Sequence, residues 1–465
     1  MMNWAQEITR RKLLTASPFS IGSLGLESLL GSNEKFSLIG GPAPKAKRVI
    51  YLFMSGGPSH VDTFDPKPLL NKRDGEKVPA EIVRNHEFAM IKESQPLLKG
   101  SDWKFYKKGN SGIEVSELFP EVGEVIDDIT VIRSVYSDTF NHDPAVMFMN
   151  TGSVRFGRPS LGAWLSYGIG SENKDLPAFV VLASGKNRQP LLDSYWGSGF
   201  LPAEHQGVQF RTKGDPVLFV KNPDGVSREK RRRQVDLINW MNAKRFDAIG
   251  DPEINARISQ YELAFRMQMS VPELTDLSSE PEYIKNSYGS EPNAVSFANN
   301  CLLARRLAER GVRFIQLYDK GWDSHGQIVS DHTERCKSVD KPIAALLKDL
   351  KQRGMLDDTL VIWGGEFGRT NYCQGSLGKD NFGRDHHGRC FSFWMAGGGS
   401  KGGTVVGQTD DYGYNVVKNG VHVHDFHATM LHLLGIDHER LTFKYQGRYF
   451  RLTDVHGKLI KNALA

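Results

Sequence analysis

Residues 342–370 read PIAALLKDLKQRGMLDDTLVIWGGEFGRT, and this stretch predicts a helix followed by a buried strand. Apolar residues recur at helical spacing from 342 to 351, whereas residues 359–363 form a short apolar run. Two glycines and Glu366 follow that run directly, which marks the end of the strand. A helix that leads into a buried strand is the repeating unit of α/β proteins with a mostly parallel sheet.

Five more segments have the length and composition of buried strands, at residues 48–54, 129–135, 178–183, 313–318 and 391–395. A second amphipathic helix is predicted at 299–310, where Leu302, Leu303 and Leu307 share one face. We therefore predict an α/β fold with a central mostly parallel sheet flanked by helices. Residues 228–268 are polar and helical in pattern, so a peripheral helical insert or lid is expected at about 228–290.

The charge of the chain is small for its length, because 465 residues carry a formal net charge of +5. Proteins that bind nucleic acid usually concentrate basic residues on one face, so this balance argues against nucleic acid as a partner. The one basic run, REKRRR at 228–233, opens the predicted insert. Two interpretations stay open for it, a solvated helix face and a phosphate-binding patch.

The N-terminus has the pattern of a twin-arginine export signal, with TRRKLL at residues 9–14. The weakly apolar stretch at 13–30 is too short and too mixed to span a membrane. We expect residues 1–44 to be a signal and linker, residues 45–465 to form one domain, and the protein to reach the periplasm or cell envelope through the twin-arginine translocase. An accidental Arg-Arg pair before an amphipathic helix is the alternative.

Four cysteines, Cys301, Cys336, Cys373 and Cys390, contain no C-x-x-C pair, so neither a zinc ribbon nor an iron–sulfur site is indicated. Cys373 and Cys390 are nearest in sequence and could form one disulfide. Four thiols that form no disulfide are the equal alternative.

Polar groups follow four of the predicted strands at the point where each strand ends. In an open α/β sheet, ligands bind beyond the carboxyl ends of the strands, so these groups are expected at one edge. Imidazoles together with carboxylates favour Zn²⁺ or Mn²⁺, whereas all-oxygen sites suit Ca²⁺ and Mg²⁺. The residues concerned are His60, Asp62, His142, Asp323, His325 and Glu366.

Two further histidine clusters occur later in the chain. The run GRDHHGR at 383–389 offers the ligands His386 and His387, and Arg384 and Arg389, whose planar forks suit phosphate or sulfate. A hydrated polar loop is the alternative for this run. In the second cluster, His422 and His424 alternate as strand residues do, while Asp425 and Thr429 have the character of helix caps.

These motifs resemble a known family. Residues 339–370 are similar to the sulfatase segment in which a helix is followed by a strand and a metal-binding turn. From about residue 45 to the C-terminus, the chain is identified as a member of the DUF1501 family, whose exported proteins are placed with the alkaline phosphatase and sulfatase superfamily. The blocks that carry the resemblance are SGGPSHVDTFDPKP (55–68), YELAFRMQMSVPEL (261–274), WDSHG (322–326), residues 346–370, GRDHH (383–387) and VHDFHATMLHLLGIDHERLT (423–442).

The resemblance implies an alkaline-phosphatase-like fold but not an activity. It places Asp323 and His325 on a ligand pair, and His386 or His387 on a later histidine ligand. The Asp-His pair of the sulfatase turn falls on Glu366 and Phe367, so only the carboxylate is kept. The carboxylate ligand that ends the first strand in the superfamily falls near Ser55, which cannot supply an anionic ligand. His60 or Asp62 would supply a ligand in its place. The position of the superfamily's nucleophile falls on His142.

Two functions are therefore expected, of which the first is an exported hydrolase of phosphate or sulfate esters that uses a divalent metal (Zn, Mn, Ca or Mg). In it, His142 would serve as nucleophile or base, and Arg158, Arg384 or Arg389 would hold the oxyanion. The alternative is a non-catalytic envelope protein that binds metal or a sulfated or phosphorylated glycan. A redox carrier is poorly supported, because no cofactor motif is present.

Overall fold

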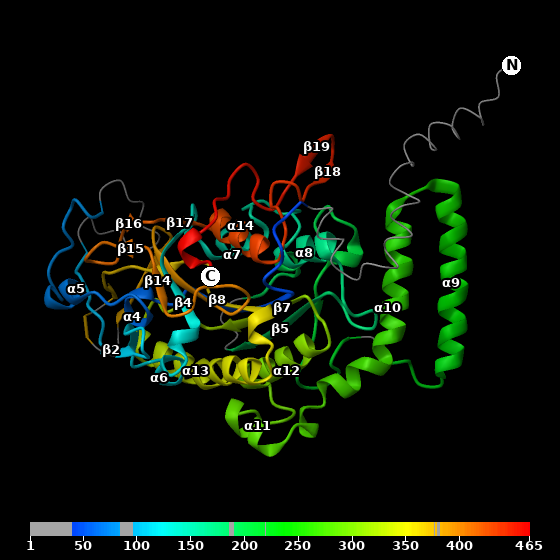
Figure 1. Ribbon diagram of the computed structural model, residues 1–465, viewed down its shortest axis with the longest axis horizontal. Coiled ribbons are helices and arrows are strands. Elements are labelled where there is room, and N and C mark those ends of the chain that lie inside the picture. Colours follow the sequence, from blue (N-terminus) through cyan, green and yellow to red (C-terminus); the bar gives the residue numbers. More distant parts are fainter. Residues whose placement is uncertain (1–39, 84–95, 186–189, 219, 376, 379–381) are drawn as a thin grey trace.

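The computed structural model describes residues 40–83, 96–185, 190–218, 220–375, 377–378 and 382–465 (Figure 1). The twin-arginine motif predicted at residues 9–14 lies outside these residues. No helix among the described residues is long and apolar enough to cross a membrane.

The core of the described chain is a nine-stranded sheet with the order β14-β4-β13-β8-β1-β7-β5-β6 and β17 paired to β4. The pairings are parallel except those of β13, which runs antiparallel to both β8 and β4. This confirms the predicted mostly parallel sheet and all six predicted strands. The strands are β1 Arg48–Ser55, β4 Ile129–Tyr136, β5 Phe179–Gly185, β6 Val208–Gln209, β7 Phe314–Lys320, β8 Thr359–Gly364, β13 Phe391–Ala396, β14 Thr404–Val406 and β17 Val421–His422.

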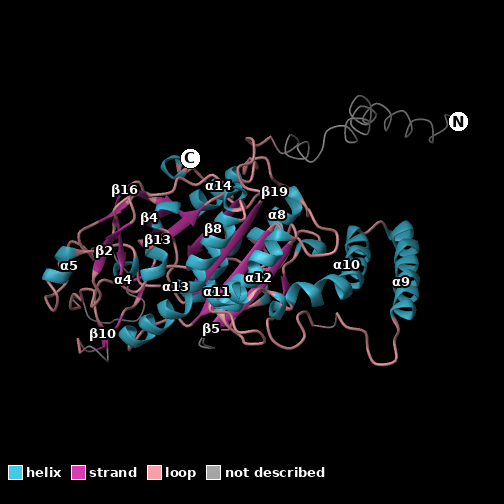
Figure 2. Cartoon of the chain, turned by 60° about the horizontal axis from the view of Figure 1, so that its bottom comes forward, coloured by secondary structure: helices cyan, strands magenta, loops and turns pink. Residues whose placement is uncertain are grey.

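Both faces of the sheet are covered, which explains why its strands are continuous apolar runs. In β1, Ile50 and Leu52 point into one core while Tyr51 and Phe53 point into the other, because side chains alternate along a strand. Figure 2 shows the strands running between the helices. One face carries α12 Phe297–Glu309 and α13 Ile328–Gln352, and the other carries α7 His142–Thr151, α8 Leu161–Ile169 and α14 Val423–Leu433.

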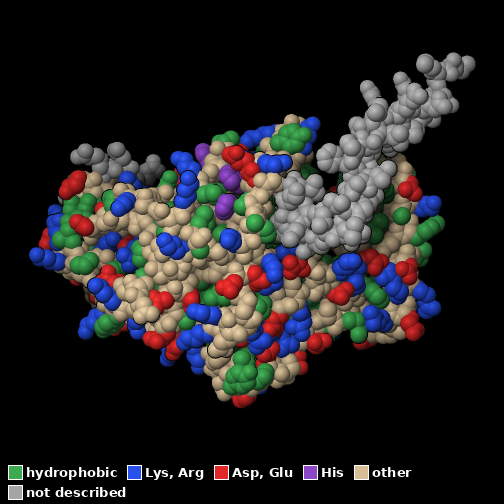
Figure 3. Space-filling model, viewed as in Figure 1, with side chains coloured by type: hydrophobic (Ala, Val, Ile, Leu, Met, Phe, Trp, Pro, Cys, Tyr) green, Lys and Arg blue, Asp and Glu red, His purple; other side chains and the backbone are tan. Residues whose placement is uncertain are grey.

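The predicted insert contains a hairpin of two long helices, α9 Arg228–Ile249 and α10 Pro252–Thr275, which stands away from the sheet (Figure 1). Ser227 caps α9, and Gly250 ends it in the left-handed conformation that favours glycine. Arg232 pairs with Glu262 across the hairpin, while Arg228, Lys230 and Arg233 are exposed. The basic run is therefore mainly a solvated helix face, and basic and acidic side chains are interspersed on the face seen in Figure 3.

Short elements complete the described chain around this frame. The helices are α4 His60–Thr63, α5 Pro68–Lys72, α6 Pro120–Gly123 and α11 Glu282–Tyr288, and the strands are β2 Phe105–Lys108, β3 Ile113–Ser116, β9 Gly368–Arg369, β10 Gln374–Gly375, β11 Phe382–Gly383, β12 His386–His387, β15 Gln408–Thr409, β16 Val416–Lys418, β18 Phe443–Tyr445 and β19 Arg448–Phe450.

Two details settle points that the sequence left open. All four cysteines are buried and none forms a disulfide, so the possible bridge between Cys373 and Cys390 is not made. The prediction that His422 and His424 alternate along a strand is wrong, because the strand ends at His422, and His422 caps α14. Asp425 completes that capping box, which confirms its role as a helix cap.

Gly56, just beyond β1, lets two chain segments approach closely. It has φ +120°, and a Cβ there would lie 2.4 Å from the backbone nitrogen of Asp323. Gly157 has φ +86°, and a Cβ there would meet no atom within 4 Å. Replacing Gly157 by alanine therefore measures the cost of the left-handed backbone conformation without a steric clash.

We expect Gly56→Ala to lower the free energy of unfolding by about 2–4 kcal/mol, because the methyl group clashes with backbone that cannot move independently. Gly157→Ala should cost only about 1–2 kcal/mol, the cost of the left-handed conformation. Chemical denaturation followed by circular dichroism measures both. Equal losses for the two variants would contradict the close approach at Gly56.

Candidate metal centre

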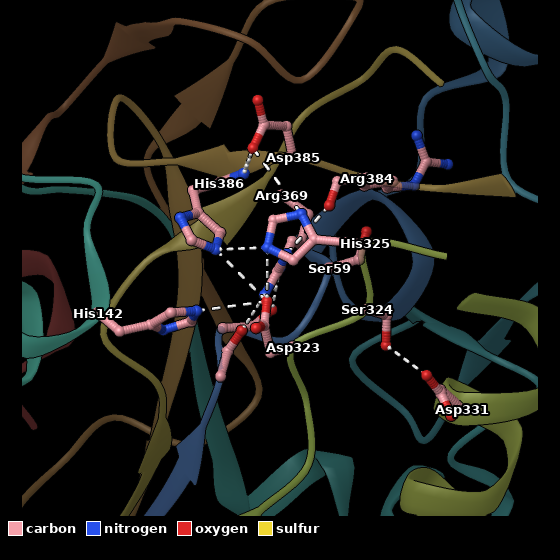
Figure 4. A network of polar contacts seen from close by, with 12 residues as sticks. Ser59, His142, Asp323, Ser324, His325, Asp331, Arg369, Arg384, Asp385 and His386 are labelled. Carbon is pink, nitrogen blue, oxygen red and sulfur yellow. Dashed lines mark hydrogen bonds and ion pairs between the residues drawn. The ribbon is translucent and has the colours of Figure 1, made fainter. Parts of the chain in front are cut away.

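Four potential metal ligands converge beyond the carboxyl ends of the central strands (Figure 4). They are His142 at the start of α7, Asp323 and His325 in the segment after β7, and His386 in β12, and one ligand atom from each lies within 4.8 Å of the others. Oδ1 of Asp323 lies 3.3 Å from Nε2 of His142, 3.0 Å from Nε2 of His325 and 3.4 Å from Nε2 of His386. This geometry resembles a ligand set around one ion.

Parallel pairing explains why residues so distant in sequence meet here. Ser55 of β1 lies opposite Lys320 of β7, so both strands end at the same level. The backbone N–H of Trp322 donates to the carbonyl of Ser55 at 3.2 Å, which turns the following residues across the end of β1. His386 arrives by a different route, because β12 pairs with β9, the short strand that follows β8.

Hydrogen bonds to Nδ1, the ring nitrogen that faces away from the cluster, orient the imidazoles of His142 and His325. Glu366 is fully buried, accepts from the N–H of Gly56 at 2.9 Å, and lies 2.7 Å from Nδ1 of His142. Nδ1 of His325 lies 2.7 Å from Oε1 of Gln374. Since both partners are acceptors, Nδ1 carries the proton in the neutral rings, and the lone pair on Nε2 faces the cluster. Acceptors on the outer nitrogen orient metal-ligating histidines in the same way.

The electrostatics of the cluster keep its carboxylate ionised and one of its imidazoles neutral. Burial raises the pKa of Asp323, but its contacts with the three histidines and the charge of Arg369 outweigh burial and hold that pKa well below its usual range. Burial lowers the pKa of His386 to about 4, so its ring is neutral near pH 7. Burial also lowers the pKa of His142, yet Asp323 and Glu366 outweigh this and the net shift is upward. An ionised carboxylate and a neutral imidazole are the forms that bind metal, so the shifts of Asp323 and His386 favour binding, whereas that of His142 favours its protonated form.

Arg369 fixes the position of Asp323 in the cluster. Its guanidinium is fully buried, Nη2 lies 2.6 Å from Oδ1 of Asp323, and it also donates to the carbonyls of Gly56, Gly57 and Arg384. It therefore ties together the loops after β1, β7 and β8.

The structure gives Glu366 and Arg384 roles other than the predicted ones. Glu366 stands behind His142 instead of in the ligand set. Arg384 is fully buried and forms an ion pair with Asp62, with its Nε 2.7 Å from Oδ2. Its remaining donors reach the carbonyls of Lys99, Gly100 and Thr370. With Asp62 and three carbonyls occupying the guanidinium, Arg384 cannot hold a substrate oxyanion, and Asp62 cannot hold a metal.

His60, His387 and Arg389 also lie apart from the cluster. His60 is buried in the short helix α4, with Nε2 2.8 Å from the carbonyl of Gly413. His387 points to the opposite side of its strand from His386 and places Nε2 2.7 Å from the carbonyl of Tyr414. Arg389 is exposed and lies over the ring of Tyr414. Neither His60 nor Asp62 therefore lies in the cluster as a replacement for the ligand that Ser55 cannot supply.

Two residues beside the cluster, Gln374 and Phe367, were given no role in the site by the sequence. Gln374 orients His325 from the short strand β10, and neutral amides are common in loops. Phe367 packs its ring 4.9 Å from that of His142 and 4.7 Å from that of His386, which makes an apolar wall beside both.

Comparison with solved structures finds only distant overall similarity, at low identity. The lipoteichoic acid synthase LtaP from Listeria monocytogenes has a TM-score of 0.36 and 10% identity, covering 94% of this chain and 82% of that one. The PsFucS1 sulfatase from Pseudoalteromonas sp. has a TM-score of 0.35 and 12% identity, covering 88% and 70%. A protein in the alkaline phosphatase superfamily from Vibrio parahaemolyticus has a TM-score of 0.33 and 9% identity, covering 91% and 84%.

Those similarities are too weak to assign a reaction, and comparison with curated protein sequences finds no match. The family itself is clear. A family model described as "Protein of unknown function (DUF1501)" matches residues 46–464, which include every member of the cluster. The chain therefore belongs to the DUF1501 family.

Proposed function

We propose that the protein is an exported, metal-dependent hydrolase of phosphate or sulfate esters. The observation that carries this proposal is the convergence of His142, Asp323, His325 and His386 at a partly open edge of the sheet. Side chains of His142, Asp323 and His325 are 19%, 21% and 28% exposed, so a substrate can reach the ligands. Export rests on the twin-arginine motif at residues 9–14.

The donor set fits a borderline divalent ion. Three imidazole nitrogens with one carboxylate oxygen suit Zn²⁺ or Mn²⁺ better than Ca²⁺ or Mg²⁺, which prefer oxygen ligands. When bound, such an ion would polarise the ester and lower the pKa of a coordinated water.

The role of His142 decides whether the metal keeps an open position for catalysis or has four protein ligands. If Asp323, His325 and His386 hold the ion, three protein ligands leave one position open, as in catalytic zinc sites. Nε2 of His142 then faces the reacting group as base or nucleophile, while Glu366 holds Nδ1 and stabilises the protonated ring. Arg384 and Arg389 are not part of this proposal, since neither reaches the cluster.

A second function follows if His142 is itself a ligand. Four protein donors complete a tetrahedral shell, which is typical of structural zinc sites. The protein would then bind metal, or a polyanion near it, without turnover. The same four side chains support both functions, so the two must be separated by substitution at His142.

We expect protein purified from its native host to contain about one equivalent of transition metal, measured by elemental mass spectrometry. Asp323→Ala should lose most of it, because the variant removes the one anionic donor of the cluster. His205→Ala is the matched control, since His205 bonds Ser166 and is outside the cluster. Equal metal content in Asp323→Ala and the parent, or none in either, would refute the site.

We expect the parent to hydrolyse at least one member of a panel of phosphate and sulfate esters in a metal-dependent manner. His142→Ala should reduce kcat by about 10²–10⁴, the range for loss of an acid–base group, while keeping its metal. Loss of metal in His142→Ala would instead identify His142 as a ligand. A parent that binds metal but cleaves no ester would favour the binding function.

A further inference from the structure

A second site lies on the helical side of the same sheet edge. A solvent-open cavity of about 530 Å³ is lined by the end of α11, the start of α12 and the middle of α13. These three helices pack side by side at the bottom of Figure 1. Asp319, near the end of β7, also lines the cavity. It shares a strand face with Ile315 and Leu317, which belong to the core beneath α12 and α13. None of the described lining residues belongs to the metal centre.

The amino end of α12 lines this cavity. Ser296 caps the helix, and its Oγ accepts from the N–H of Asn299 at 3.1 Å. The first N–H groups of a helix have no partner within the helix, and the helix dipole adds positive potential there. Ser296, Phe297 and Ala298 all line the cavity, so the amino end of a 13-residue helix faces into it.

Three cationic side chains of α13 line the same space, namely Arg335, Lys337 and Lys341. Arg335 is only 8% exposed, and its Nε makes no hydrogen bond although it is buried. Nη2 pairs with the exposed Glu334 at 2.7 Å, and Nη1 lies 4.0 Å from Asp319. A buried guanidinium with an unused donor is costly unless a further acceptor is supplied.

Asp319 offsets only part of this positive potential. Its carboxylate already accepts from Ser184 Oγ at 3.0 Å and from Trp322 Nε1 at 3.1 Å. It is the one acidic residue among the described residues that line the cavity, against three cations.

From these contacts we infer that the cavity binds a small-molecule oxyanion, a phosphate or sulfate group held by Arg335, Lys341 and the amino end of α12. A helix amino end combined with an arginine fork is a common anion-binding arrangement. Phe297 and Pro342 add apolar walls, which leave room for an organic part of the ligand. The inference does not depend on the proposed hydrolase.

Isothermal titration calorimetry of the chelator-treated full chain with inorganic phosphate tests this site. We expect one saturable site whose Kd rises about tenfold or more in Arg335→Gln, since charge-assisted hydrogen bonds are lost. Lys341→Gln should weaken binding by about threefold, a smaller effect because Lys341 is exposed. Lys348→Gln, on the same helix but outside the cavity, is the matched control and should leave Kd unchanged.

Asp323→Ala distinguishes this site from the metal centre. Phosphate binding that persists in Asp323→Ala supports the cavity, whereas binding lost only in that variant overturns it. Absence of saturable binding, or an unchanged Kd in both Arg335→Gln and Lys341→Gln, also overturns it. If Arg335→Gln does not fold, the double substitution of Lys337 and Lys341 by Gln gives the same test.

Phenyl phosphate identifies the form of the ligand. Tighter binding than inorganic phosphate would show that the apolar walls contact an organic group. Equal affinity would show that the site takes the free anion. Both results support an oxyanion site. They differ only in whether the ligand is a free anion or an organic phosphate.

Discussion

The parallel pairing of β1 with β7 on one side and β8 on the other is the constraint on which the rest of the structure depends. The three strands are buried on both faces, so their register is fixed by apolar side chains that cannot move to the other core without exposure. Because the strands are parallel, their carboxyl ends lie together. The segments that carry His142, Asp323, His325 and His386 are all anchored to this edge.

Buried ion pairs hold the loops at that edge in place. Arg369 connects Asp323 with backbone carbonyls of the first loop, and Arg384 connects Asp62 with three more. Burying a guanidinium is unfavourable unless its donors are satisfied, and here they are. These two arginines position the loops of the site, and their donors are already used by Asp323, Asp62 and backbone carbonyls.

Two residues at the end of strand β7 belong to two different sites. Asp323, beyond its end, faces histidines and is suited to hold a cation. Asp319, within the strand, faces α12 and α13, where Arg335 and a helix amino end are suited to hold an anion. Trp322 links the two, since its indole donates to Asp319 and its backbone N–H donates to Ser55 beside the metal centre. Residues 319–323 thus contribute to both sites.

The sequence by itself determined the layers of this protein and half of its site. Continuous apolar runs located every central strand except the short edge strands, because burial on both faces leaves no other pattern. The spacing of Asp323 and His325 after a strand was enough to predict a ligand pair, and histidines at 142 and 386 were visible as candidates.

Tertiary structure alone decided which candidates meet. His386 and His387 are neighbours in sequence, yet strand alternation sends one to the cluster and the other to the carbonyl of Tyr414. Glu366 became the partner of His142, and Asp62 that of Arg384, through contacts across more than 220 residues of chain. Ligand geometry is set by distances of a few ångströms between separate elements, and residue type and spacing along one segment do not encode those distances.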